Sequence, residues 1–78
     1  MTLNELAIND KCYIKTIKTK GELRRRMLDL GLVEGTRVQC AFKAPFGEPV
    51  AYHVRGTLIA LRREDAKQIE IEQVTAYD

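Results

Sequence analysis

One stretch of the chain decides the fold, residues 19–35, which read TKGELRRRMLDLGLVEG. Thr19 and Glu22 have the spacing of a capping box, in which a hydroxyl and a carboxylate accept hydrogen bonds from backbone amides of the first helical turn. Gly31 stands where a left-handed residue ends a helix, and Leu32 is placed to fold back onto the last turn. The stretch therefore predicts one short helix, with signals for both of its ends.

The helix is expected to bury one stripe of side chains and to expose the rest. Leu23, Met27 and Leu30 recur at helical spacing, so we expect them to pack on the strands. Leu28 projects about 140° away from Leu23, beside Arg24. An exposed leucine beside an arginine has the composition of an interface anchor. A solvated helix face explains the same residues, and the sequence leaves both interpretations open.

Five segments around the helix have strand character, because they are short, rich in β-branched and aromatic residues, and mostly alternating. The run at 57–61 is almost continuously apolar, as expected of a strand buried on both faces. Residues 2–6 and 63–66 indicate single helical turns, and residues 75–78 indicate a loose tail. The strand segments are residues 11–17, 36–43, 50–55, 57–61 and 69–72.

The second and third strands are joined by residues 44–49, which read APFGEP. Prolines cannot donate to a strand ladder, so this segment is expected to be a stiff hairpin loop. An aromatic residue at such a tip normally folds inward if it meets only water, which makes Phe46 a candidate partner contact. Strict alternation assigns these strand residues to the core: Cys12, Ile14, Thr16, Val38, Cys40, Phe42, Val50, Tyr52 and Val54.

The 78 residues allow one domain, spanning residues 1–78. A short sheet protects its edges best by closing on itself. We therefore expect a mainly β fold, a small SH3-like barrel of about five strands with one helix inserted after the first strand.

The residues that catalysis or metal binding would need are scarce. His53 is the only histidine, and Cys12 and Cys40 are far apart, which excludes a histidine pair or a cysteine cluster within one chain. Gly31 and Gly35 lack the Lys-Ser/Thr of a phosphate loop and follow a helix instead of a strand. We expect no enzyme, no cofactor and no metal site in a monomer. The spacing leaves open a disulfide between the two cysteines and a metal site shared by two chains.

The charge balance is almost even, thirteen Lys and Arg against eleven Asp and Glu, for a formal charge of +2. The basic run 24–26 has acids at helical spacing, and the pairs Glu22–Arg26 and Arg25–Asp29 are expected to neutralise much of it. No apolar run reaches the ~20 residues of a membrane span, and the first residues lack the pattern of a signal peptide. We expect a cytoplasmic protein with reduced thiols.

Several pieces of the sequence, taken together, resemble the FeoA family. The resemblance implies a small SH3-like cytoplasmic protein that works with FeoB, a membrane ferrous iron transporter with a cytosolic G-protein domain, and that is held peripherally at the inner membrane through this partner. It supplies no catalytic residues. The pieces are residues 28–36 (LDLGLVEGT), 44–49 (APFGEP), 55–56 (RG), 61–66 (LRREDA) and 69–71 (IEI), within a match from about residue 3 to 74.

We therefore expect a non-catalytic accessory protein for ferrous iron uptake that docks on a FeoB-like transporter, with Arg24, Leu28 and Phe46 as partner contacts. The alternative is a nucleic-acid-binding or ribosome-binding barrel, which would need a basic stripe with exposed aromatic residues. The even charge and the core assignment of Phe42 and Tyr52 disfavour it, so no nucleic acid is expected. The sequence leaves open the oligomeric state, weak self-association included, and whether the partner is activated, inhibited or scaffolded.

Overall fold

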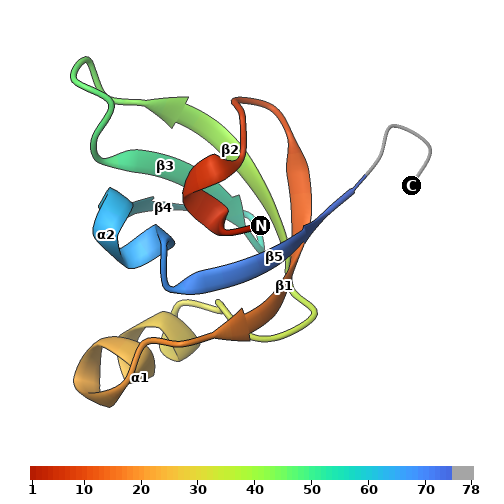
Figure 1. The fold of residues 1–78 in the computed structure, drawn as a ribbon, viewed down its shortest axis with the longest axis vertical. Helices are drawn as coiled ribbons and strands as arrows, with labels where there is room; N and C mark the ends of the chain where they lie inside the picture. The colour runs from red at the N-terminus through yellow and green to blue at the C-terminus, as the bar shows by residue number, and fades with distance from the viewer. Residues whose placement is uncertain (75–78) are drawn as a thin grey trace.

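The predicted strands are present in the computed structural model, which describes residues 1–74, and they pair antiparallel in one sheet. The sheet curls, and the helical turn α2 (Arg63–Ala66) lies between its two edge strands (Figure 1). The mainly β fold is confirmed, while the predicted tail lies outside the described residues. Across the sheet the order is β4 (Thr57–Leu61), β3 (Val50–Val54), β2 (Arg37–Lys43), β1 (Lys11–Ile17) and β5 (Ile69–Gln73).

The helix α1 spans Gly21–Asp29, within the predicted stretch, but it does not begin as predicted. Its N-cap is Lys20, whose side chain makes no capping hydrogen bond. Glu22 is therefore the second helical residue instead of the third, where a capping-box acid must stand. The Thr19 hydroxyl is buried and has no hydrogen-bond partner among the described residues. The predicted Thr19–Glu22 capping box is wrong because the helix begins one residue later than the box requires.

The other end of α1 is as predicted. The Leu32 amide donates to the Met27 carbonyl at 2.9 Å, and the Gly31 amide donates to the Leu28 carbonyl at 3.0 Å. Gly31 has φ +97°, in the left-handed region. Met27 and Leu32 are both buried, which completes a Schellman motif. This motif turns the chain back from α1 into the sheet.

The first residues form a 3-10 turn, η1 (Leu3–Glu5), that covers the inside of the curled sheet. Its capping box is present, and the Thr2 amide donates to the Glu5 carboxylate at 3.0 Å. Leu3 and Leu6 are buried, as predicted. The buried Tyr52 hydroxyl donates to the Leu3 carbonyl at 3.4 Å, so the turn also satisfies a polar group in the core.

Two β-bulges change which side chains face the core. The register between β1 and β5 shifts between Ile14 and Thr16, so Thr16 is exposed and Ile17 is buried. The register between β2 and β3 shifts between Cys40 and Phe42, and Phe42 is 53% exposed. A bulge inserts one extra residue and reverses the alternation after it. The core assignments of Thr16 and Phe42 are therefore wrong.

The strand β4 is an edge strand and is not buried on both faces as predicted. It pairs with β3 and with no other described strand. Ile59 and Leu61 are buried, whereas Leu58 and Ala60 are exposed. The apolar run therefore has one core face and one open face. The buried cluster consists of Leu3, Leu6, Cys12, Ile14, Ile17, Met27, Leu32, Val38, Cys40, Val50, Tyr52, Val54, Ile59, Leu61, Ala66, Ile69 and Ile71.

Candidate functional site

The leucines of the predicted helix stripe face a groove instead of the core. Met27 is 1% exposed, but Leu23 is 39% and Leu30 is 45% exposed. The predicted burial of Leu23 and Leu30 against the strands is wrong. α1 stands at one end of the molecule (Figure 1), and the two leucines line a gap that is also lined by Ala60 and Leu61 of β4. Only the middle of the stripe reaches the core.

We call this gap the α1–β4 groove, a cavity of about 320 Å³ open to solvent. Most of its lining is apolar, and β4, on its far side, has no described strand along its outer edge. Apolar surface beside an unpaired strand edge is typical of a protein contact. The lining residues are Leu23, Arg26, Met27, Leu30, Pro49, Ala60, Leu61, Arg62 and Asp65.

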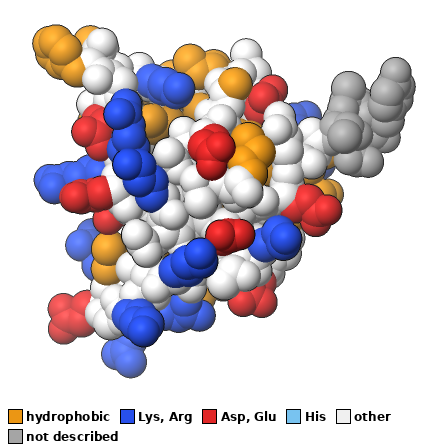
Figure 2. Space-filling view, in the orientation of Figure 1, with side chains coloured by type: hydrophobic (Ala, Val, Ile, Leu, Met, Phe, Trp, Pro, Cys, Tyr) orange, Lys and Arg blue, Asp and Glu red, His pale blue; other side chains and the backbone are white. Residues whose placement is uncertain are grey.

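Phe46 lies at the tip of the loop between β2 and β3 and is 97% exposed. Hydrophobic side chains at this tip project clear of the body of the molecule (Figure 2). The loop itself is braced, since the Gly47 amide donates to the Ala44 carbonyl at 2.7 Å and the Arg63 amide donates to the Glu48 carboxylate at 2.6 Å. An exposed aromatic ring on a braced loop loses little entropy when it binds.

The structure does not bring the three sequence-predicted contacts, Arg24, Leu28 and Phe46, into one surface. The Arg24 guanidinium donates to the Ile17 carbonyl at 2.6 Å and to the Thr19 carbonyl at 3.5 Å, so it braces the link between β1 and α1. Leu28 is 39% exposed but does not line the α1–β4 groove. In Figure 1, α1 and the tip of the β2–β3 loop lie at opposite ends of the long axis.

The predicted ion pairs along α1 are not formed. Neither Arg25–Asp29 nor Glu22–Arg26 is among the ion pairs of residues 1–74. Exposed pairs of long side chains gain little over hydration, so their absence costs little. Arg26 consequently leaves positive charge at the α1–β4 groove.

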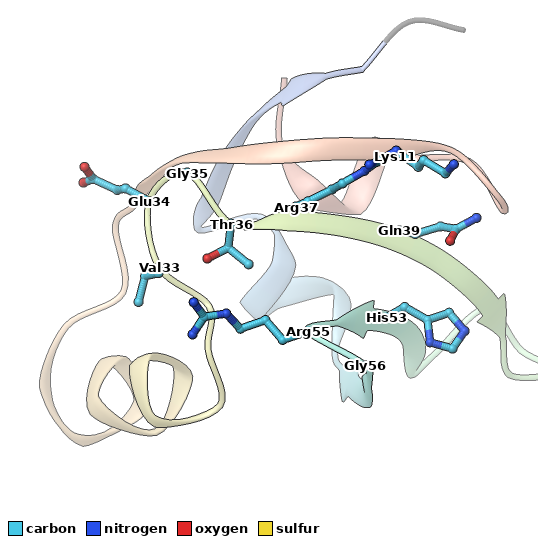
Figure 3. Close-up of a pocket in the computed structure, with 10 residues that line it drawn as sticks. All are labelled: Lys11, Val33, Glu34, Gly35, Thr36, Arg37, Gln39, His53, Arg55 and Gly56. Atoms are coloured by element: carbon cyan, nitrogen blue, oxygen red, sulfur yellow. The ribbon is translucent and has the colours of Figure 1, made fainter. Parts of the chain in front are cut away.

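A second, larger groove of about 700 Å³ lies on the outer face of β1, β2 and β3 (Figure 3). We call it the outer groove. Strand alternation predicts polar faces for Arg37, Gln39, His53 and Arg55, and the fold brings these four side chains into one groove. The lining residues are Lys11, Val33, Glu34, Gly35, Thr36, Arg37, Gln39, His53, Arg55 and Gly56.

The cysteines are both free and buried in the core, so the disulfide that the spacing left open is not formed. Burial raises the pKa of Cys12 to about 11 and raises that of Cys40 above its usual range. Both are therefore protonated thiols at neutral pH, which are poor nucleophiles and poor ligands. Within the described part of the chain, no cluster of three or more His, Cys, Asp or Glu is arranged for a metal ion, and no helix is long and apolar enough to cross a bilayer.

Comparison with known sequences gives one consistent match. The model of the FeoA domain family matches residues 1–73. A protein of Porphyromonas gingivalis, described as a fusion of Fe(2+) transport protein A with the Fe(2+) transporter FeoB, is 36% identical over 76 residues. The match covers 97% of this chain and 9% of that protein, so the chain corresponds to a small part of the fusion.

Solved structures give the same match for the fold. The solution structure of the FeoA protein from Chlorobium tepidum has a TM-score of 0.91 and 32% identity, covering 96% of this chain and 71% of that one. The crystal structure of Stenotrophomonas maltophilia FeoA complexed with zinc has a TM-score of 0.81 and 32% identity, covering 92% and 89%. That protein is described as a prokaryotic SH3 domain protein, and the predicted SH3-like fold is confirmed.

Proposed function

Because this chain belongs to the FeoA family, we propose that it is a non-catalytic accessory protein of ferrous iron uptake that docks on a FeoB-like transporter and modulates it. The P. gingivalis fusion supports docking, since it joins a similar domain and a transporter in one polypeptide. A covalent link holds two modules at high effective concentration, which favours a contact between them. The chain would act in the cytoplasm, peripheral to the membrane that holds the transporter.

The α1–β4 groove is the observation that supports docking most. It exposes about two fifths of Leu23 and of Leu30, and Ala60 and Leu61 lie across from them. An apolar side chain of a partner inserted here would remove the exposed parts of both leucines from water. β4 is an edge strand of the sheet, and its Ala60 and Leu61 line the groove.

Phe46 is a second anchor in this proposal, and the helix face of Arg24 and Leu28 is a separate candidate surface. The Phe46 ring is free of its own chain, so a partner can bury nearly all of it. Arg24 already donates to two carbonyls of its own chain, which reduces what a partner would gain from it. We therefore rank the groove and, as a separate contact, Phe46 above that helix face.

The test is binding of the chain to the purified transporter in detergent, measured by biolayer interferometry. Leu23→Ala and Leu28→Ala are a matched pair, because both leucines are on α1 and 39% exposed, and only Leu23 lines the groove. We expect Leu23→Ala and Phe46→Ala each to weaken binding by more than about fivefold, which is about 1 kcal/mol. Thermal melts check that each variant is folded.

The matched pair also separates the two surfaces. If Leu28→Ala weakens binding and Leu23→Ala does not, the chain docks through the helix face and the groove assignment is wrong. If the parent chain does not bind the transporter at all, the proposed function itself is refuted.

A further inference from the structure

The outer groove concentrates positive charge in a chain whose charges otherwise almost balance. Lys11, Arg37 and Arg55 line it, whereas Glu34 is the one carboxylate of its lining. Figure 3 shows the Glu34 side chain pointing away from the groove. No ion pair of the described residues includes any of these three cations. Uncompensated cations in a concave surface raise the local concentration of anions.

The strand register arranges the donors of the groove in rows. Lys11 on β1 is directly opposite Gln39 on β2, and Gln39 is opposite His53 on β3. Neighbouring strands are about 4.8 Å apart, so these three side chains form one row across the sheet. Arg37 is two residues before Gln39 on the same face, about 6.7 Å along the strand. The groove thus presents donors at the repeat of an extended chain.

Arg55 is positioned by its own backbone and by Gly31, the residue after the C-cap of α1. It has φ +52° in the turn between β3 and β4, followed by Gly56 at φ +78°. Its aliphatic stem lies over Gly31, where a Cβ would be only 2.9 Å from the Arg55 Cδ. In Figure 3 the guanidinium extends from there toward Thr36 and Val33. A guanidinium binds a carboxylate through two parallel hydrogen bonds.

The shape and lining of the groove favour one kind of occupant. A flat lipid surface reaches only the rim of a concave site, and single-stranded nucleic acid needs aromatic side chains on which bases stack. The lining contains no Phe, Tyr or Trp, and the exposed ring opposite Arg37, that of Tyr13, is a single ring and cannot stack successive bases. An extended acidic peptide presents carboxylates on one side at every second residue, which matches the spacing of the donor rows. Charge, shape and spacing agree only for the peptide.

We propose that the outer groove binds an acidic segment, in extended conformation, of the protein on which the chain docks. This inference rests on the proposed function only in assigning the segment to the docking partner. Arg37 and Arg55 bind carboxylates, and Lys11 contributes a third charge. The outer groove and the α1–β4 groove share no lining residue, so the two sites can be tested separately.

The probe is a fluorescein-labelled peptide of eight residues, alternating glutamate and serine, titrated with the chain and followed by fluorescence anisotropy. We expect saturable binding at 25 mM salt that weakens as salt is raised, as for any contact dominated by charge. Arg37→Gln and Arg55→Gln should each weaken binding by at least about fivefold. Lys20→Gln and Lys67→Gln are the controls, because they remove the same charge from exposed positions outside the groove and should change binding less than about twofold.

Several results would overturn the inference. The first is that the peptide does not bind. The second is that the groove variants and the control variants lose peptide affinity equally. The third is that phosphatidylglycerol vesicles or oligouridylate bind more tightly than the peptide through the same arginines. If Arg55→Gln does not fold, Arg37→Gln decides alone, since Arg37 is exposed on β2. The assay contains no transporter, so its failure leaves docking through Leu23 unaffected. Leu23→Ala should bind the peptide as the parent does.

Discussion

Met27 and Leu30 fall on one predicted stripe of the helix, yet replacing each with alanine is expected to have different effects on stability. Met27 is 1% exposed, so Met27→Ala leaves a cavity and should lower the free energy of unfolding by about 2–5 kcal/mol. Complete burial of a leucine side chain is worth about 1.5–3 kcal/mol. Leu30 is 45% exposed beside an open groove, so Leu30→Ala should cost only about 1 kcal/mol.

The measurement is urea unfolding followed by far-UV circular dichroism, with the slope m compared between variants. A chain of 78 residues is expected to unfold with about 4–12 kcal/mol, so the two losses are easily distinguished. Alanine is the best helix former, which keeps propensity out of the comparison. If Leu30→Ala costs as much as Met27→Ala at equal m, Leu30 is packed in solution and the α1–β4 groove is closed.

Three further predictions concern the parts that hold the two grooves in place. Gly31→Ala should lower the free energy of unfolding by about 1–3 kcal/mol, because φ is +97° at this position and the new Cβ would meet the Arg55 side chain. In a double-mutant cycle, adding Arg55→Ala should recover the cost of the clash with Arg55 but not the cost of the left-handed backbone. Arg24→Ala should lower the free energy of unfolding by about 1.5–3 kcal/mol, because it removes the donor to the Ile17 carbonyl at the end of β1. Arg25→Ala, at an exposed position on the same helix, should change it by less than about 0.5 kcal/mol. Equal losses of both variants in urea unfolding would contradict the bracing role of Arg24. The free energy of unfolding should fall as pH rises from about 9 to about 11, because burial raises the pKa of Cys12 from 9.0 to about 11, and unfolding then releases its proton. Burial raises the pKa of Cys40 and of Tyr52 as well, so Cys12→Ala should reduce this slope without removing it, and an unchanged slope would show that Cys12 does not contribute.

Features encoded by neighbouring residues could be predicted from the sequence. Gly31 and Leu32 end the helix through hydrogen bonds that close within six residues, so no distant partner is needed to recognise them. Phe46 is exposed, as expected of a residue between two loop prolines. The five strands follow from local composition in the same way. Local chemistry thus defines the elements and the hairpin tip.

The direction in which side chains face depends on residues far away in the chain, and here prediction failed. The bulge before Phe42 exists in the pairing of β2 with β3, and nothing in the local pattern marks it. Leu23 and Leu30 are exposed because α1 stands away from β4, a matter of packing between distant elements. Arg37 and Arg55 were both on polar strand faces in the sequence, but their meeting in one groove required the register of three strands.

The pairing of β1 with β5 has a consequence for how the chain holds its own ends. Lys18 and Glu70, which pair at 3.0 Å beside these strands, are 52 residues apart, while six residues join β2 to β3. Closing the longer loop costs about 2 kcal/mol more in chain entropy. The β2–β3–β4 meander therefore forms at lower entropic cost, and β5 gains its place only once β1 is ordered. The Met1 carbonyl accepts from the Ile71 amide at 2.9 Å, so the first residues depend on the same late pairing. The last strand and the first residues are thus both held through β1, so loosening β1 releases both, whereas β1 itself is also held by β2.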